Sequence, residues 1–428
     1  MHAPRRLSMI CLLATLPLVC APARKARPTQ PAVSAKMRAA AASRVTKQLD
    51  AKPADPIERA GALVPFFQFL SRTTEALHIL HFGDSHTAAD MWTGELRTSF
   101  QKDFGDGGAG FSLPGRPFPG YRRFDLRSGA SPRWQTEGLR GIEGDGLLGL
   151  GGVSISTAYM GQSVTLQADC GYLEVFYLQQ PGGGRIALYQ DGEMVQEAST
   201  DGELAPGFLT YPTTSGPHHF ELRTLESAPV RLFGWVTEKA QGVTYESMGL
   251  NGAEAAWILR WNEAMLASYI GRRNPALIVL AYGTNEAGDP QWTQESYRDM
   301  FSELLGRLRR AAPLASILVV GPPDRLYRYR GRLGTLPKLD VIIDAQKEAC
   351  RLNGCAFWDT RARMGGKGSM RDWVQAGLAQ FDYVHFNGAG YTRLAAALYQ
   401  DILQEFEVFR QENIAWTNKQ ESSPSSGP

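Results

Sequence analysis

The pattern of hydrophobic and polar positions changes character twice along the chain. From Ile57 it predicts a helix, then a buried strand over Leu77–Phe82 and a second helix that begins near Ser85. Between about Gly105 and Gly242 the helical spacing disappears, and short alternating runs are separated by frequent Gly and Pro. These runs predict an inserted antiparallel β-domain, which we expect to be a sandwich.

Helical and buried-strand patterns resume after this stretch. The expected helices cover Ala253–Ile270, Tyr297–Ala312, Leu339–Leu352 and Gly390–Glu407, and the expected strands cover Ala276–Ala281, Ala315–Val320 and Ala356–Trp358. Continuous apolar strands that alternate with helices are typical of a parallel sheet. We therefore predict one α/β domain over residues 58–115 and 239–415, interrupted by the β-domain at 116–238, in which Asp191-Gly192 is a hairpin turn.

The first 23 residues have the pattern of a secretory signal. Arg5 and Arg6 precede the apolar run Leu7–Val19, which is too short to span a bilayer, and small residues before the end predict cleavage after Ala23. Lipid anchoring through Cys20 is the alternative, disfavoured because Val19 rather than a small residue precedes that cysteine. We expect export to the periplasm, with no transmembrane segment left after cleavage.

The ends of the mature chain are expected to lack packed structure. Residues 24–57 are rich in Ala, Arg, Lys and Pro and are expected to form a flexible basic leader with at most a short helix. Residues 416–428 end in Ser, Pro and Gly and are expected to form a disordered tail.

Composition excludes several classes of protein. The 428 residues are 43% hydrophobic and 21% charged, which excludes a disordered chain, a collagen and a coiled coil. The net charge of +2 gives no support for nucleic-acid binding. Cys350 and Cys355 flank a turn signal and form either a short disulfide or two separate buried thiols, and their spacing is not a zinc signature. We expect neither a metal nor another cofactor; the oligomeric state is left open.

The most informative motif is HFGDSHTAAD, which places Ser85 directly after the first buried strand. Ligands of open α/β sheets bind at the carboxyl ends of the strands, and the first amides of a helix are free to bind an anion there. Ser85 is therefore a candidate nucleophile. The alternative is that it only caps the helix, which serine does well.

A second motif, FDYVHFNGAGY, places Asp382 three residues before His385. A serine hydroxyl needs a base to take its proton, and a neutral imidazole held by a carboxylate supplies one. A surface loop with an Asx-turn is the alternative interpretation. The chain has only seven histidines, so a candidate base with an aspartate close by is nearly unique.

Two further motifs offer donors for a developing oxyanion. Asn285 follows the buried strand in LAYGTNEAG, and its amide could donate to a negative oxygen. Gly252 in ESMGLNGAEA is expected to open a helix, which would leave its N–H free. The Gly-Thr-Asn stretch could instead be an ordinary turn.

The four stretches resemble the conserved blocks of the SGNH, or GDSL-like, hydrolases, in the right order. The resemblance implies a three-layer α/β sandwich with a parallel sheet, a catalytic triad of Ser85, Asp382 and His385, and an oxyanion hole made by Ser85, Gly252 and Asn285. It covers roughly residues 58–110 and 240–412. His86 and Glu286 depart from the family pattern, which has Leu and Asp at these positions in many members.

Within that superfamily, the motifs, the position of the insert and the export signal look most like the peptidoglycan O-acetylesterases of Gram-negative bacteria. The resemblance implies hydrolysis of acetyl esters on muramic acid and an insert similar to a carbohydrate-binding module, with Tyr177, Tyr189 and Tyr211 as candidate aromatic faces. An O-acetyltransferase of the same fold would use the same residues. A glycan-binding protein without activity is disfavoured because the candidate site is intact.

Overall fold

The computed structural model describes residues 33–72, 76–140 and 144–422, with side chains described as far as Asn413. The expected signal sequence, the first part of the leader and the last six residues lie outside this range. None of the helices in the described part of the chain is long and apolar enough to cross a membrane.

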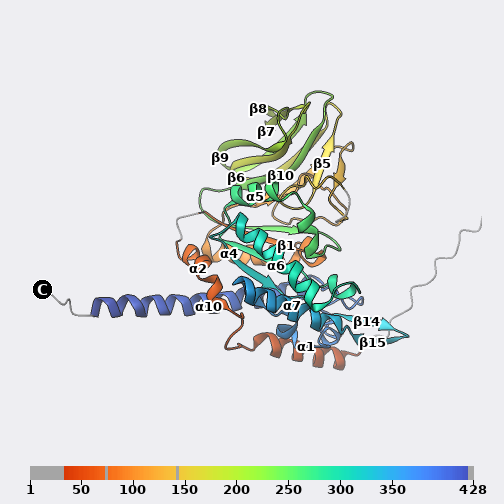
Figure 1. Cartoon of the computed structure of the whole chain (residues 1–428), viewed down its shortest axis with the longest axis vertical. Coiled ribbons are helices and arrows are strands. Elements are labelled where there is room, and N and C mark those ends of the chain that lie inside the picture. The colour runs from red at the N-terminus through yellow and green to blue at the C-terminus, as the bar shows by residue number, and fades with distance from the viewer. Residues whose placement is uncertain (1–32, 73–75, 141–143, 423–428) are drawn as a thin grey trace, which may run out of the picture.

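The described residues build two large sheets, which lie one above the other in Figure 1, and one two-stranded hairpin. The lower sheet has five strands, all parallel, in the order β11-β1-β12-β13-β16. Its strands are β1 (Ala76–Gly83), β11 (Gly242–Gly249), β12 (Leu277–Ala281), β13 (Ser316–Val320) and β16 (Ala356–Trp358). The predicted parallel α/β sheet is therefore confirmed.

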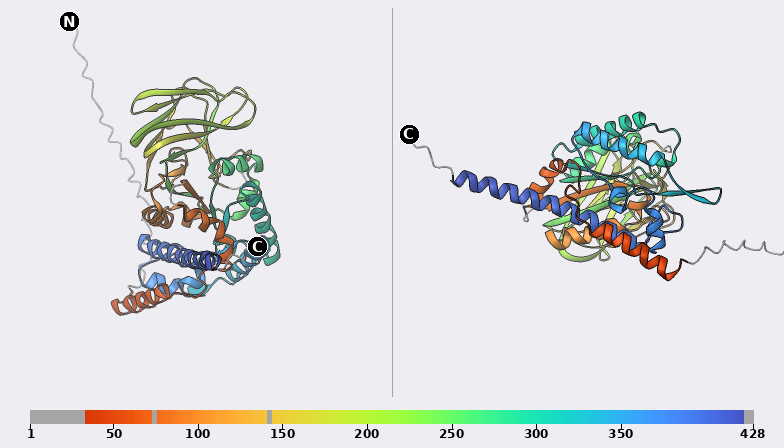
Figure 2. Two further views of the ribbon diagram at one scale, coloured as in Figure 1. Left: turned by 90° about the vertical axis from the view of Figure 1, so that its left-hand side faces the viewer. Right: turned by 90° about the horizontal axis from the view of Figure 1, so that it is seen from below.

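Helices cover both faces of the parallel sheet (Figures 1 and 2). On β12, Ile278 and Leu280 join the core made with one helix layer, whereas Leu277 and Val279 join the core made with the other layer. One layer contains α5 (Glu263–Arg273), α6 (Gln294–Ala311) and α7 (Lys338–Asn353). The other contains α1 (Ala35–Asp50), α2 (Val64–Leu70), α4 (Met91–Phe104), α8 (Thr360–Met364), α9 (Met370–Gln375) and α10 (Gly388–Ser422). This is a three-layer sandwich.

The second sheet is antiparallel and, in the described part of the chain, has nine strands. They are β2 (Gly110–Ser112), β3 (Arg127–Ala130), β4 (Gln135–Glu137), β5 (Ser154–Thr157), β6 (Ser163–Gln179), β7 (Arg185–Gln190), β8 (Glu193–Ser199), β9 (Ala205–Thr224) and β10 (Val230–Glu238). The long strands β6 and β9 pair along their length, with a bulge between Cys170 and Tyr172, and the strands surround a core of their own. Asp191 and Gly192 join β7 to β8 with positive φ values of 54° and 96°, which confirms the predicted hairpin turn.

The antiparallel sheet shares a core with the α/β part. Phe176 on β6 stacks on Tyr269 of α5 with ring centroids 5.6 Å apart, and Phe233 of β10 contacts the same tyrosine ring. Arg272 of α5 pairs with Glu174 of β6 at 2.5 Å. Because apolar side chains from both parts are buried against each other, the insert is not a module attached only by its two connections.

The structure corrects several expected elements. The expected helix over Ala253–Ile270 is a 3₁₀ segment, η2 (Ala255–Arg260), followed by α5, because Asn262 caps α5 by accepting from the amide of Met265. The expected flexible leader contains α1, which buries Ala41, Val45 and Leu49. Helix α10 continues beyond the expected start of the tail at residue 416. A hairpin, β14 (Leu326–Tyr329) and β15 (Arg332–Thr335), was not expected.

Two alternatives were open for Cys350 and Cys355, a short disulfide or two separate buried thiols. The structure has the separate thiols. Cys350 and Cys355 are free and buried, as is Cys170.

Two glycines allow a helix to pack at the carboxyl edge of the parallel sheet. Gly83, the last residue of β1, lies in register with Gly249 of β11 and Ala281 of β12. A Cβ atom on Gly249 would lie 2.0 Å from the amide nitrogen of Ala88, the last residue of the short helix α3 (Ser85–Ala88). Only glycine lets the helix backbone approach β11 so closely.

We expect Gly249→Ala to destabilise the protein by about 1–3 kcal/mol, because α3 must shift to admit the methyl group. Ser85 would shift with the helix, so esterase activity should fall as well. Thermal unfolding and hydrolysis of a small acetyl ester measure the two effects.

Gly271→Ala is the matched control, because Gly271 is an exposed helical residue and no neighbouring atom lies within 4 Å of the place its methyl group would take. It should stabilise the protein by up to about 1 kcal/mol. Wild-type stability and activity in Gly249→Ala would contradict the close packing described here.

Candidate active site

Ser85 lies at the turn between β1 and α3. Asp84 caps the helix, because its Oδ1 accepts from the amide of His86 at 2.9 Å. The hydroxyl of Ser85 is half-buried at the first position of the helix. The alternative interpretation of Ser85 as a helix cap is therefore wrong: Asp84 is the cap, and the Ser85 side chain is available for another contact.

Ser85, His385 and Asp382 form a chain of hydrogen bonds. The Ser85 Oγ lies 2.9 Å from Nε2 of His385, and Nδ1 of His385 lies 2.7 Å from Oδ2 of Asp382. The other oxygen of Asp382 accepts from the amides of Val384 and His385. The loop before α10 thus orients the imidazole, with a neutral His385 donating to Asp382 and accepting from Ser85.

The charges around the imidazole support a basic nitrogen facing Ser85. The hydrogen bond to Asp382 raises the pKa of His385, and burial opposes this shift. Burial alone would raise the pKa of Asp382, but the hydrogen bonds from His385 and the two amides lower it to about 2. Asp382 is therefore ionised at neutral pH and favours the protonated imidazole that forms when a base takes up a proton.

The Gly and Asn motifs meet beside this chain. Nδ2 of Asn285 donates to the carbonyl oxygen of Ala253 at 2.8 Å, which leaves a second N–H of the same amide group for another acceptor. Gly252 does not open a helix as expected. It lies in an exposed turn at φ 76°, three residues before η2 begins at Ala255.

Glu286 connects the same two motifs, and the sequence analysis did not identify its role. Its buried carboxylate accepts from the amide of Ala255 and from the amide of Gly283, each at 2.9 Å. Burial raises the pKa of Glu286 to about 8. One side chain therefore holds the turns that carry Gly252 and Asn285 at a fixed separation.

His86 is a packing residue rather than a residue exposed to ligand. Its Nδ1 lies 2.8 Å from the hydroxyl of Tyr391, and its ring lies 5.2 Å from that of His385. Burial lowers the pKa of His86 to about 3, so the ring is neutral and adds no charge next to the triad. Asp84 is also buried, and burial raises its pKa to about 6.

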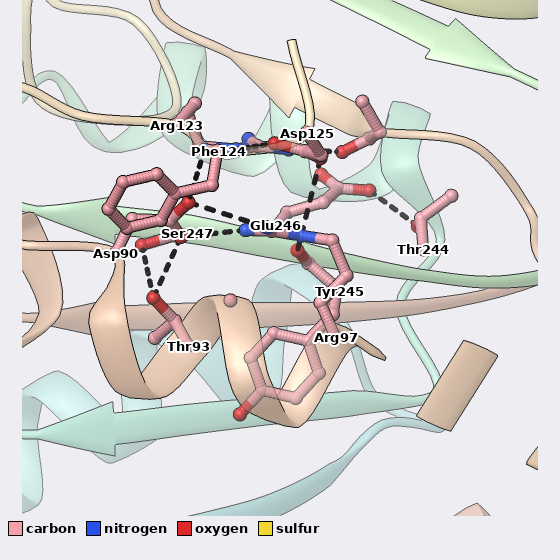
Figure 3. A network of polar contacts seen from close by, with 12 residues as sticks. Asp90, Thr93, Arg97, Arg123, Phe124, Asp125, Thr244, Tyr245, Glu246 and Ser247 are labelled. Carbon is pink, nitrogen blue, oxygen red and sulfur yellow. Dashed lines mark hydrogen bonds and ion pairs between the residues drawn. The ribbon is translucent and has the colours of Figure 1, made fainter. Parts of the chain in front are cut away.

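A buried polar network holds the helices that follow Ser85 (Figure 3). Asp90 links α3 to α4 in a left-handed conformation and is fully buried, and its carboxylate accepts from Arg97 and Thr93 and from the amide of Phe124. Arg97 also donates to the carbonyl of Tyr245 on β11. The segment between β2 and β3 is thereby linked to the connection that follows Ser85.

Arg325 is a second residue that the sequence analysis missed. It follows Gly321-Pro322-Pro323 at the carboxyl end of β13, and this position was the available signal. Its Nη1 donates to the carbonyl of Thr284, and the next amide, of Leu326, donates to the carbonyl of Tyr383. The guanidinium therefore lies between the Asn285 turn and the loop with Asp382 and His385. The hydrogen bond from His385 to Asp382 raises the pKa of His385, and the charge of Arg325 opposes this rise.

Tyr177, one of the expected aromatic faces, is only 8% exposed, whereas Tyr189 and Tyr211 are partly exposed.

In the described residues, His78, Glu238 and Glu246 lie close enough to hold a metal ion. Arg273 already supplies a cation to that cluster, because its Nη2 lies 2.5 Å from an oxygen of each glutamate.

Comparison with known families assigns the class of the protein. Residues 214–393 match the GDSL-like lipase/acylhydrolase family. This segment includes Gly252, Asn285, Asp382 and His385, whereas Ser85 lies upstream of it because most of the inserted sheet intervenes. No curated protein sequence matches the chain.

Solved structures give a second, independent comparison. A peptidoglycan O-acetylesterase matches with 28% identity and a TM-score of 0.70, over 80% of this chain and 96% of that one. Family two carbohydrate esterases from Clostridium thermocellum and Cellvibrio japonicus match at 14% and 13% identity. They cover 59% and 66% of this chain and 95% and 98% of theirs, and their TM-scores of 0.29 and 0.28 carry no weight here.

The chain therefore contains a GDSL-like lipase/acylhydrolase domain. It is a carboxylic ester hydrolase with the fold of a peptidoglycan O-acetylesterase.

We expect Arg325→Ala to move the acidic limb of the kcat/KM–pH profile to higher pH. Removing this cation leaves the pKa of His385 higher than in the wild type, and a histidine base works only when neutral. The profile is measured with a small acetyl ester. Arg325→Lys keeps the charge and is the control, so its limb should stay nearer the wild-type position. An unmoved limb in Arg325→Ala would show that the guanidinium does not act on His385.

Proposed function

We propose that the protein is an exported serine esterase that removes O-acetyl groups from the muramic acid of peptidoglycan. The observation that carries the proposal is the hydrogen-bonded chain Ser85–His385–Asp382, in a fold that matches a peptidoglycan O-acetylesterase at 28% identity. The proposed location is the periplasm, which rests on the signal-like sequence of residues 1–23.

In the first step, Ser85 attacks the acetyl carbonyl while Nε2 of His385 takes the hydroxyl proton. Asp382 keeps the imidazole oriented and favours the cation that forms. The oxyanion is bound by the amides of Ser85 and Gly252 and by the second N–H of Asn285. The sugar hydroxyl leaves with the proton from His385, and an acetyl group remains on Ser85.

In the second step, water takes the place of the sugar. His385 removes a proton from the water, the hydroxide attacks the acetyl carbonyl, and acetate leaves as Ser85 regains its proton. Each ionic intermediate is stabilised by groups that are already in place, because Glu286 and the Asn285–Ala253 bond hold the turns before substrate binds.

A polysaccharide O-acetyltransferase would share the first step and differ only in the acceptor. Acetate release therefore distinguishes the two functions: a hydrolase releases free acetate from O-acetylated peptidoglycan, whereas a transferase moves the acetyl group to an added glycan. Acetylated xylan and alginate, tested beside peptidoglycan, report which polysaccharide is preferred.

We expect Ser85→Ala to abolish acetate release while the melting temperature stays near that of the wild type. Truncating one half-buried hydroxyl at a turn costs little stability. The measurements are acetate release from peptidoglycan and thermal unfolding. Activity within tenfold of the wild type would mean that a different residue is the nucleophile.

We expect Asn285→Ala to lower kcat by roughly 10² to 10³, the range for the loss of one oxyanion donor. KM should change much less, because the second N–H of Asn285 is used in the transition state. Steady-state kinetics with a small acetyl ester separate the two constants. An effect confined to KM would reassign Asn285 to binding of the ground-state substrate.

A further inference from the structure

The segment between β2 and β3 forms a hollow that the reaction does not use. About 410 Å³ of space is lined by residues of this segment, from Gly115 to Ser128. A second hollow of about 500 Å³ adjoins it and shares Phe124, Leu126 and Arg127 with the first. Together they form a groove along the inserted sheet as far as His218 and His219, which we call the insert groove.

The segment has charged residues both on its buried side and on its exposed side. Arg123 is buried, donates to the carbonyls of Phe111 and Ala109, and pairs with Asp125 at 2.6 Å. Exposed positions are occupied by Arg116, Arg122 and Arg127. Within the described parts of the chain, these three guanidinium groups have no acidic partner, so the lining of the first hollow carries uncompensated positive charge. The second hollow is also lined by three aspartates, Asp125, Asp169 and Asp191, which pair with Arg123, Lys239 and His218.

An aromatic side chain lies among these cations. Phe124 is 64% exposed, which is unusual for so large an apolar residue, and it lines both hollows. Its ring rests near Gly94 of α4, where a Cβ would lie 3.7 Å from the ring. A flat apolar face beside cations suits a sugar ring that carries a carboxylate group.

The buried network in Figure 3 holds the segment that lines the groove against Asp90 and Arg97, which belong to the helix connection after Ser85. The amide of Phe124 donates to Asp90 at 3.0 Å, and Asp125 lies 3.4 Å from Arg97, which itself binds Asp90. On the other side, Gly120 approaches the side chain of Asn251, the neighbour of Gly252. The segment therefore contacts both the helix connection after Ser85 and the turn that carries Gly252.

We propose that the insert groove binds the carboxylate-bearing part of the glycan strand whose acetyl group is being removed. Arg116, Arg122 and Arg127 would bind the carboxylates of lactyl groups or stem peptides, and Phe124 would contact a sugar face. This inference rests on the proposed function, because it assigns an anionic polymer to the same site. The occupant is peptidoglycan rather than a neutral acetylated glycan.

The test compares two double variants with equal changes of charge. Arg122→Ala with Arg127→Ala removes two groove cations. Arg328→Ala with Arg330→Ala removes two exposed cations from the β14–β15 hairpin, which projects from the body of the protein in Figures 1 and 2. Each variant is assayed on a small acetyl ester, on acetylated xylan and on O-acetylated peptidoglycan.

We expect the groove variant to raise KM on peptidoglycan by roughly tenfold, with the other two substrates within about twofold of the wild type. Phe124→Ala should also weaken the enzyme on peptidoglycan selectively. The wild-type KM on peptidoglycan should rise with salt, and the groove variant should show a smaller rise.

Three results would overturn the proposal: no change on peptidoglycan, an equal change on xylan, or an equal change in the hairpin variant, which would point to bulk charge. Binding of Ser85→Ala protein to peptidoglycan sacculi, with and without the groove substitutions, needs no turnover. If the wild type releases no acetate from peptidoglycan, the proposed function fails, and the binding assay alone still decides whether the groove holds this polymer.

Discussion

The site depends on one constraint, the common carboxyl edge of three neighbouring parallel strands. β1, β11 and β12 end in register at Gly83, Gly249 and Ala281, so the segments that follow them meet above the sheet. These segments carry Ser85, Gly252 and Asn285. Helix α3 approaches β11 closely, which is possible only without a side chain at Gly249. This approach sets the position of Ser85.

Buried carboxylates hold the segments that follow the strand ends in place. Glu286 fixes the two turns on one side of Ser85, and Asp90 fixes the connection to α4 on the other. Each carboxylate is buried and accepts several hydrogen bonds, so removing a donor would leave an uncompensated polar group. Arg273 plays the equivalent part at the far end of the sheet, where it binds Glu238 at the end of the insert and Glu246 on β11. Asp90 and Arg273 thus connect the insert to the segments next to Ser85 and to β11.

Much of the fold and of the candidate site could be predicted from the sequence, because both depend on local patterns. Apolar runs mark buried strands, and the parallel arrangement places whatever follows each strand at one edge, so Ser85 and Asn285 were found from short motifs. Glu286 and Arg325 were missed because their partners, such as the amide of Ala255 and the carbonyl of Thr284, are brought to them only by tertiary structure. The break at Asn262 and the packing of α1 were missed for related reasons: a single cap outweighs helical periodicity, and the face that α1 buries is small.

The inserted sheet also determines when the protein can become active. Ser85 and His385 are 300 residues apart, and β1 cannot pair with β11 until every strand of the insert has been made. Pairing over such separations is slow to form, since the entropy of closing a long loop is lost before the contacts are gained. A chain synthesised from its amino terminus therefore carries Ser85 without its hydrogen-bond partner His385 until most of the chain has been made. In the proposed mechanism, esterase activity requires the loop that precedes α10 to reach Ser85, so the activity reports that the last part of the chain has folded.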